Sequence, residues 1–63
     1  MFNKPRYTVV ENAGYEGEND IATFPTYAEA DEHMRHLYGA DERDELHVTI
    51  RKDYPDGEGT YEF

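Results

Sequence analysis

The 63-residue chain contains no cysteine, no serine and no tryptophan, and its only lysines are Lys4 and Lys52. Without cysteine, neither disulfides nor thiolate zinc sites can supplement the core. Nucleophilic catalysis needs an activated serine, cysteine or lysine beside a base, and these side chains are absent or scarce. A domain of this size also offers little room for an enclosed pocket. We therefore expect a protein that is not an enzyme and that carries no cofactor.

Long apolar runs are missing as well. No segment approaches the roughly 18 apolar residues that a membrane span requires. Residues 1–6 lack the apolar region of a signal peptide. These absences predict a cytoplasmic protein with no membrane partner. The length predicts one small acidic domain, residues 1–63, because a chain this short buries only about 60% of its unfolded surface.

Residues 26–39 carry the clearest structural pattern, a helix with a signal at each end. Thr26 can cap the first turn, and Glu29, three residues later, completes a capping box. Gly39 can adopt the left-handed conformation that ends a helix. A stripe of apolar residues with helical spacing is expected to face the core, and it comprises Tyr27, Ala30, Met34, Leu37 and Tyr38.

Alternation of apolar and polar residues predicts short strands on both sides of this helix. The expected strands are residues 6–11, 21–24, 46–51 and 60–63. In the third, Leu46, Val48 and Ile50 form the buried face, and His47, Thr49 and Arg51 form the solvent face. In the last, Tyr61 and Phe63 share one face.

The remaining segments connect these elements. Residues 12–20 and 54–59 are rich in glycine and acidic side chains, which is typical of a loop and a turn, and residues 40–45 are expected to be a polar connection. The sequence therefore predicts an α+β fold, in which a small antiparallel sheet of three or four strands is covered on one face by a single helix. The predicted order is strand, strand, helix, strand, strand. If residues 12–23 are irregular, the sheet has three strands.

Two segments have spacings that also occur in metal sites. His33 and His36 lie one helical turn apart near Glu29 and Glu32, but no third ligand is fixed by spacing. Residues 16–20 have acids at alternate positions, as at the start of a calcium loop, without the glycine and the glutamate that complete one. We predict surface histidines and a solvated acidic loop, with no bound metal.

The tyrosines are expected to divide between the core and the surface. Tyr7, Tyr27, Tyr38 and Tyr61 are predicted core residues. Tyr15 lies in the acidic loop, where no periodicity requires its burial. It can be an exposed anchor for a partner, or it can fold back over the sheet, and the sequence favours neither.

The strongest global signal is charge, because fifteen acidic residues face six basic ones and give a net charge of −9. The simplest interpretation is a very soluble protein, or one from a salt-rich habitat. The functional interpretation is a surface that binds a basic partner, since self-repulsion of this size opposes a compact state. The acidic residues form four clusters: Glu16, Glu18 and Asp20; Glu29, Asp31 and Glu32; Asp41, Glu42, Asp44 and Glu45; Asp53, Asp56 and Glu58.

The second and third clusters can form one stripe, which Arg35 and Arg43 interrupt. Duplex DNA carries one negative charge per roughly 1.7 Å of its axis, so a row of carboxylates can occupy a groove built for DNA. From these clusters we predict a partner-binding surface of six residues: Glu29, Glu32, Asp41, Glu42, Asp44 and Glu45. The expected partner is a basic DNA-binding protein.

In size, acidity, lack of cysteine and layout, the whole chain resembles anti-CRISPR proteins, a group of small phage-encoded inhibitors. It looks most like inhibitors of type I systems, and anti-restriction proteins share the same features. The resemblance implies an inhibitor that mimics double-stranded DNA on the basic DNA-recognition surface of a CRISPR surveillance complex or similar defence nuclease. Such an inhibitor blocks the binding of target DNA and does not itself bind nucleic acid.

Two other classes of function fit the same sequence. One is an acidic interaction module that does not mimic DNA, such as an antitoxin or an adaptor for a basic partner. The other is a small metal or ligand binder that uses His33 and His36. Competition with DNA separates the first from a DNA mimic, and metal titration tests the second.

Overall fold

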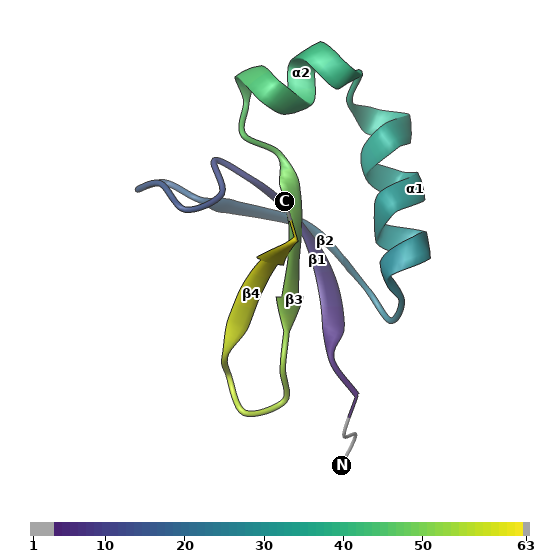
Figure 1. The fold of residues 1–63 in the computed structure, drawn as a ribbon, viewed down its shortest axis with the longest axis vertical. Coiled ribbons are helices and arrows are strands. Elements are labelled where there is room, and N and C mark those ends of the chain that lie inside the picture. Colours follow the sequence, from purple (N-terminus) through teal and green to yellow (C-terminus); the bar gives the residue numbers. More distant parts are fainter. Residues whose placement is uncertain (1–3, 63) are drawn as a thin grey trace.

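The structure, a computed structural model, describes residues 4–62 and contains four strands and two helices (Figure 1). In chain order they are β1 (Arg6–Glu11), β2 (Asn19–Phe24), α1 (Tyr27–Leu37), α2 (Ala40–Glu45), β3 (Thr49–Asp53) and β4 (Gly59–Glu62). An α+β fold with a four-stranded antiparallel sheet is thereby confirmed. The prediction of a single helix is wrong, because residues 40–45 form a second one. The three-stranded alternative is wrong as well, because residues 19–24 form a strand.

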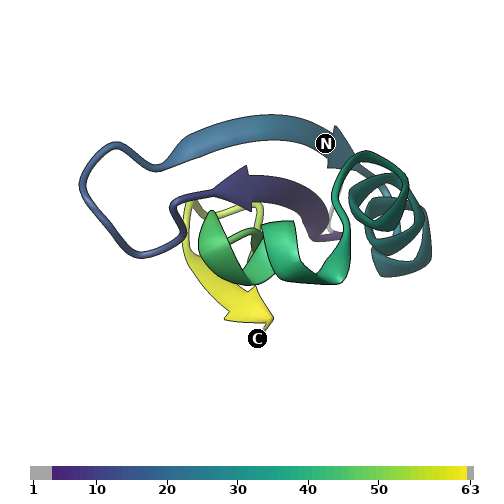
Figure 2. The ribbon, with the colours of Figure 1, turned by 90° about the horizontal axis from the view of Figure 1, so that it is seen from above.

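The strands lie in the order β2-β1-β3-β4, and each neighbouring pair is antiparallel. β2 and β3 therefore run in the same direction on either side of β1, and the connection between them carries both helices. α1 packs against β1, β2 and β3, whereas α2 buries none of its residues. Seen from above, the β1–β2 loop and α1 lie at opposite ends of the molecule (Figure 2).

The main core lies between α1 and the sheet. Its buried members are Val9, Ala30, Met34, Val48 and Ile50, and Tyr7, Ile21, Phe24 and Tyr38 pack against them. The predicted burial of Ala30 and Met34 is confirmed. Tyr27 and Leu37 are 44% and 49% exposed, against the prediction. Tyr27 lies in the first turn of α1 and Leu37 is its last residue, so only the middle of the helix faces the core.

The two ends of α1 differ in their agreement with the sequence signals. At the start, the Thr26 Oγ1 accepts a hydrogen bond from the Glu29 N–H at 3.2 Å, as predicted. At the end, the prediction that Gly39 ends α1 in a left-handed conformation is wrong. Tyr38 closes α1 in an extended conformation. Gly39 has a φ of −73° and is the N-cap of α2. The Gly39 N–H donates to the Glu42 Oε1 at 3.2 Å. Carboxylates in a first turn favour a helix start at this point.

β3 begins later than predicted. Leu46 closes α2 and is exposed, and His47 has a positive φ of 53°, so the strand starts at Thr49. Leu46 is the one residue of the predicted buried face that lies outside the core. Of the predicted solvent face, His47 is exposed as predicted. The prediction is wrong for the other two residues, since Thr49 is only 6% exposed and the Arg51 side chain 19%.

The second face of the sheet, opposite α1, is covered by polar side chains instead of a helix. Thr8 and Val10 point to this face and are fully buried. Tyr61 pairs in register with Arg51, so it also lies on this face and not in the core as predicted. Phe63, predicted to share a face with Tyr61, lies outside the described residues.

Candidate functional site

The six carboxylates predicted to bind a partner lie on the two helices. Glu29 and Glu32 belong to α1, and the other four, Asp41, Glu42, Asp44 and Glu45, belong to α2. All six are exposed. None of them forms an ion pair within residues 4–62. Their charges are therefore presented to solvent rather than neutralised inside the fold.

Two of the cations that could neutralise this surface, Arg35 and Lys52, are engaged elsewhere. Arg35 pairs with Asp31 on its own helix, with its Nε 2.8 Å from Oδ2. The Lys52 Nζ lies 5.8 Å and 5.3 Å from the ring centres of Tyr7 and Tyr54. Residues 26–47 contain seven carboxylates against two guanidinium groups, so this segment carries −5 of the total charge of −9.

The six carboxylates do not line one common cavity. The α1 pair lines a shallow depression beside β2, with Phe24, Glu29, Glu32, His33 and His36 around it. Asp44 lines a different hollow, the groove between the two helices and the start of β3. The predicted surface therefore consists of separate groups on two helices that meet at Gly39.

The two predicted surface histidines lie next to the α1 carboxylates. The His33 ring lies against Phe24, with 5.0 Å between the ring centres and an angle of 50° between the ring planes, and His36 is exposed. The part of the chain that the structure describes holds no group of three or more histidine, aspartate or glutamate side chains positioned to bind a metal ion. This ring contact gives His33 a packing role on the edge of the core.

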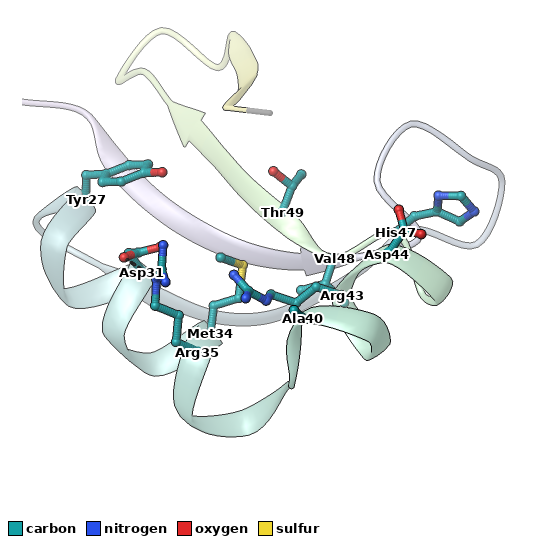
Figure 3. Close-up of a pocket in the computed structure, with 10 residues that line it drawn as sticks. All are labelled: Tyr27, Asp31, Met34, Arg35, Ala40, Arg43, Asp44, His47, Val48 and Thr49. Atoms are coloured by element: carbon teal, nitrogen blue, oxygen red, sulfur yellow. Dashed lines mark hydrogen bonds and ion pairs between the residues drawn. The ribbon is translucent and has the colours of Figure 1, made fainter.

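A groove of about 470 Å³ separates the two helices from the start of β3 (Figure 3). It is lined by Tyr27, Asp31, Met34, Arg35, Ala40, Arg43, Asp44, His47, Val48 and Thr49. Its apolar side chains are Tyr27 and Ala40, which are exposed, and Met34 and Val48, which belong to the core. The Arg43 side chain extends from α2 toward Met34 (Figure 3), and its Nε is buried without a hydrogen-bond partner among the described residues. The groove thus combines apolar surface with an arginine that has no carboxylate partner within residues 4–62.

Arg51 is the centre of a polar network on the second face of the sheet. Its guanidinium group lies 2.7 Å from Glu18, 3.0 Å from Asp20 and 2.6 Å from Asp53. The Tyr61 hydroxyl donates to the Glu18 carboxylate. Arg51 therefore ties the β1–β2 loop and β2 to β3, and Tyr61 joins β4 to the network through Glu18.

These contacts shift the pKa values of three members of the network, Glu18, Arg51 and Asp53. The hydrogen bond from Tyr61 lowers the pKa of Glu18 below its ordinary value of 4.5, and the Arg51 guanidinium lowers the pKa of Asp53. Hydrogen bonds to Asp53 and then to Asp20 raise the pKa of Arg51 above its ordinary value. The network therefore keeps Glu18 and Asp53 ionised, and its role is to hold the sheet together.

Tyr15 is 59% exposed, and its ring lies 4.7 Å from that of His47. The loop that carries Tyr15 is held to the segment after α2, because the Ala13 N–H donates to the His47 carbonyl at 3.0 Å. Of the two alternatives for Tyr15, the structure favours the exposed one.

From the sequence, Arg43 was interpreted only as an interruption of the acidic stripe and Arg51 only as a solvent-facing residue, and neither was assigned a function. The sequence does contain a signal that Arg43 lacks an ion-pair partner on its own helix, because no residue three or four positions away is acidic. These positions hold Gly39, Ala40, Leu46 and His47. Arg35, by contrast, has Asp31 four residues before it. For Arg51 the signal is weaker, since its partners Glu18 and Asp20 are more than 30 residues away in the sequence.

Neither helix within residues 4–62 has the length and apolar character needed to cross a bilayer. A function proposed for this molecule rests on the charges and contacts described above. Compared with protein-family models, with curated proteins and with solved structures, the chain matches none of them.

Proposed function

We propose that the protein is an inhibitor that mimics double-stranded DNA on the basic DNA-recognition surface of another protein. Its target is a type I CRISPR surveillance complex or a similar defence nuclease, whose binding of target DNA it blocks. The observation that carries this proposal is the set of exposed carboxylates on α1 and α2, none of them ion-paired within the described chain. Arginine and lysine side chains that bind phosphates also bind carboxylates.

The uneven distribution of charge supports a binding role for the helices. Arg51 neutralises part of the acidic charge of the sheet, whereas residues 26–47 retain a charge of −5. Concentrated charge of one sign accelerates association with an oppositely charged partner. A basic DNA-binding surface would therefore be attracted most strongly to the helical side of the molecule.

Competition with DNA tests the proposal. A purified type I surveillance complex should release its double-stranded target DNA when the protein is added, as measured by gel shift. Inhibition should weaken as salt rises, because exposed charges are screened. A complex that holds its DNA and this protein at the same time would contradict the proposal.

The variant Glu32→Lys/Glu45→Lys should lose inhibition while it remains folded. Both residues are exposed, and neither lies in the first turn of its helix. Asp41 and Glu42 are less suitable positions, because they form the first turn of α2, where negative charge stabilises a helix. Thermal melting checks that the variant is folded before its inhibition is scored.

A matched control separates the helical surface from net charge. Glu16→Lys/Glu58→Lys makes the same change in charge at two exposed residues, one in the β1–β2 loop and one in the β3–β4 turn. This control should still inhibit. Equal loss in both double variants would mean that total charge, and not the helical surface, is responsible.

The second candidate is an acidic interaction module that does not mimic DNA, such as an antitoxin or an adaptor. The groove between the helices favours it, because mimicry of DNA gives no role to a buried, unsatisfied guanidinium nitrogen. A module of this kind would leave its partner's DNA in place, so the gel shift also separates the two candidates.

A further inference from the structure

Arg43 has no carboxylate partner within residues 4–62, although the chain has fifteen acidic residues. The spacing of the sequence explains this, because no acid lies three or four positions away. Its Nε is also buried and makes no hydrogen bond to a described residue. Nε itself is enclosed by the fold, but Arg43 lines the groove. An acceptor that enters the groove can therefore bind the terminal nitrogens of the guanidinium group.

The groove around Arg43 differs in charge from the rest of the helical surface. Arg35 neutralises Asp31 at 2.8 Å, which leaves Arg43 and Asp44 as the other two charged residues of the lining. The lining is therefore close to neutral, whereas residues 26–47 as a whole carry −5. An anionic group that the outer surface repels can enter here.

The apolar part of the groove defines the rest of the occupant. Met34 and Val48 belong to the core and also line the groove, and the exposed ring of Tyr27 lies at the other end from His47 (Figure 3). α2, which forms one wall, buries none of its own residues. An occupant with apolar side chains would supply the packing that α2 lacks.

We propose that this groove binds an extended segment of a partner protein that carries an aspartate or glutamate beside an apolar side chain. The carboxylate would accept hydrogen bonds from the Arg43 guanidinium, a pairing that is often bidentate. The apolar side chain would pack on Met34 and Val48. A metabolite is a poorer fit, because the groove is open along its length and small molecules need enclosure. The site shares only Asp44 with the surface proposed to mimic DNA.

Selection from a phage-displayed library of random peptides tests the groove, at an ionic strength of about 0.15 M to limit attraction between exposed charges. The enriched peptides should share an acidic residue next to an apolar one. An enriched peptide should shift the Met34 methyl resonance in an NMR titration. Replacing its acidic residue by the corresponding amide should weaken binding about tenfold or more.

Two variants of the protein, each lacking one positive charge, complete the test. Arg43→Gln should weaken peptide binding about tenfold or more, whereas Lys4→Gln, at an exposed residue outside the groove, should change it less than about twofold. The inference is overturned if no motif is enriched, if only basic peptides are enriched, or if Arg43→Gln binds the acidic peptides normally. Arg43→Gln should still compete with DNA, and the double variant Glu32→Lys/Glu45→Lys should still bind the peptide. Failure of the groove proposal can therefore be distinguished from failure of the DNA-mimic proposal.

Discussion

Arg51 donates hydrogen bonds to three carboxylates, which come from the β1–β2 loop, β2 and β3. Thr8 and Val10 are buried on the same face of the sheet as Arg51, although no helix within residues 4–62 covers this face. The Thr8 hydroxyl also donates to Asp53 at 2.8 Å. At this position one long side chain, with its acidic partners, takes the place of a second layer of structure.

We expect Arg51→Ala to lower the free energy of unfolding by about 2 kcal/mol, because it leaves partly buried carboxylates beside one another without a counter-charge. Urea denaturation measures this loss. The control is Arg35→Ala, which removes an exposed pair on one helix and should cost only about 0.3–0.5 kcal/mol. Equal losses would mean that the network contributes no more than a surface ion pair.

A second residue-scale prediction concerns α1. Met34→Ala should destabilise the domain by about 2–5 kcal/mol, since it truncates a buried side chain at the centre of the core. Leu37→Ala, three residues later on the same helix, should change stability by less than about 0.5 kcal/mol, because Leu37 is exposed. A comparison of the two melting temperatures would reveal a wrong assignment of the buried face.

At the scale of elements, the cap of α1 is local and can be tested by itself. Thr26→Ala removes the acceptor for the Glu29 N–H and should cost about 1 kcal/mol. Thr26→Ser keeps a hydroxyl at the same place, so its stability should lie close to that of the wild type. An alanine variant as stable as the serine variant would show that the cap contributes nothing measurable.

The elements that the sequence predicted well are those determined by local patterns. β1 and the start of α1 have the predicted bounds, because strand alternation and a threonine cap act over a few residues. α2 was missed because Gly39 is equally compatible with ending one helix and beginning the next, and the carboxylates that favour the second outcome were interpreted as a connection. The face of Arg51 was misassigned because its burial depends on residues distant in the chain. The groove could not be predicted, because its shape depends on the position of α2 relative to α1, and the periodicity of the sequence does not determine that position.

At the scale of the whole molecule, the net charge of −9 and the Arg51 network respond to acid in opposite ways. Protonation of carboxylates relieves general repulsion. Glu18 and Asp53, however, have lowered pKa values in the folded state. Their stabilising contribution is therefore complete above their ordinary pKa values, 4.5 and 3.8, and is lost as the pH falls through the lower, folded values.

A comparison with Glu18→Gln isolates the contribution of the network. The wild type should be more stable than this variant at neutral pH, and the difference should shrink as the pH falls below 4.5, the ordinary pKa of the group that was removed. Unfolding free energies measured at several pH values give this difference directly. A difference that stays constant into acid would show that the Glu18 carboxylate does not stabilise the fold through its charge.

The central place of β1 in the sheet has a consequence for the order of events in folding. The β1–β2 and β3–β4 hairpins are local, and isolated hairpins are marginally stable in water. They join only when β1 pairs with β3, which brings together residues as distant as Thr8 and Asp53, 45 positions apart. Closure of so long a segment is slow compared with local contacts. A nascent chain therefore stays unfolded and open to proteases until β3 has been synthesised, and the domain then forms in one cooperative step.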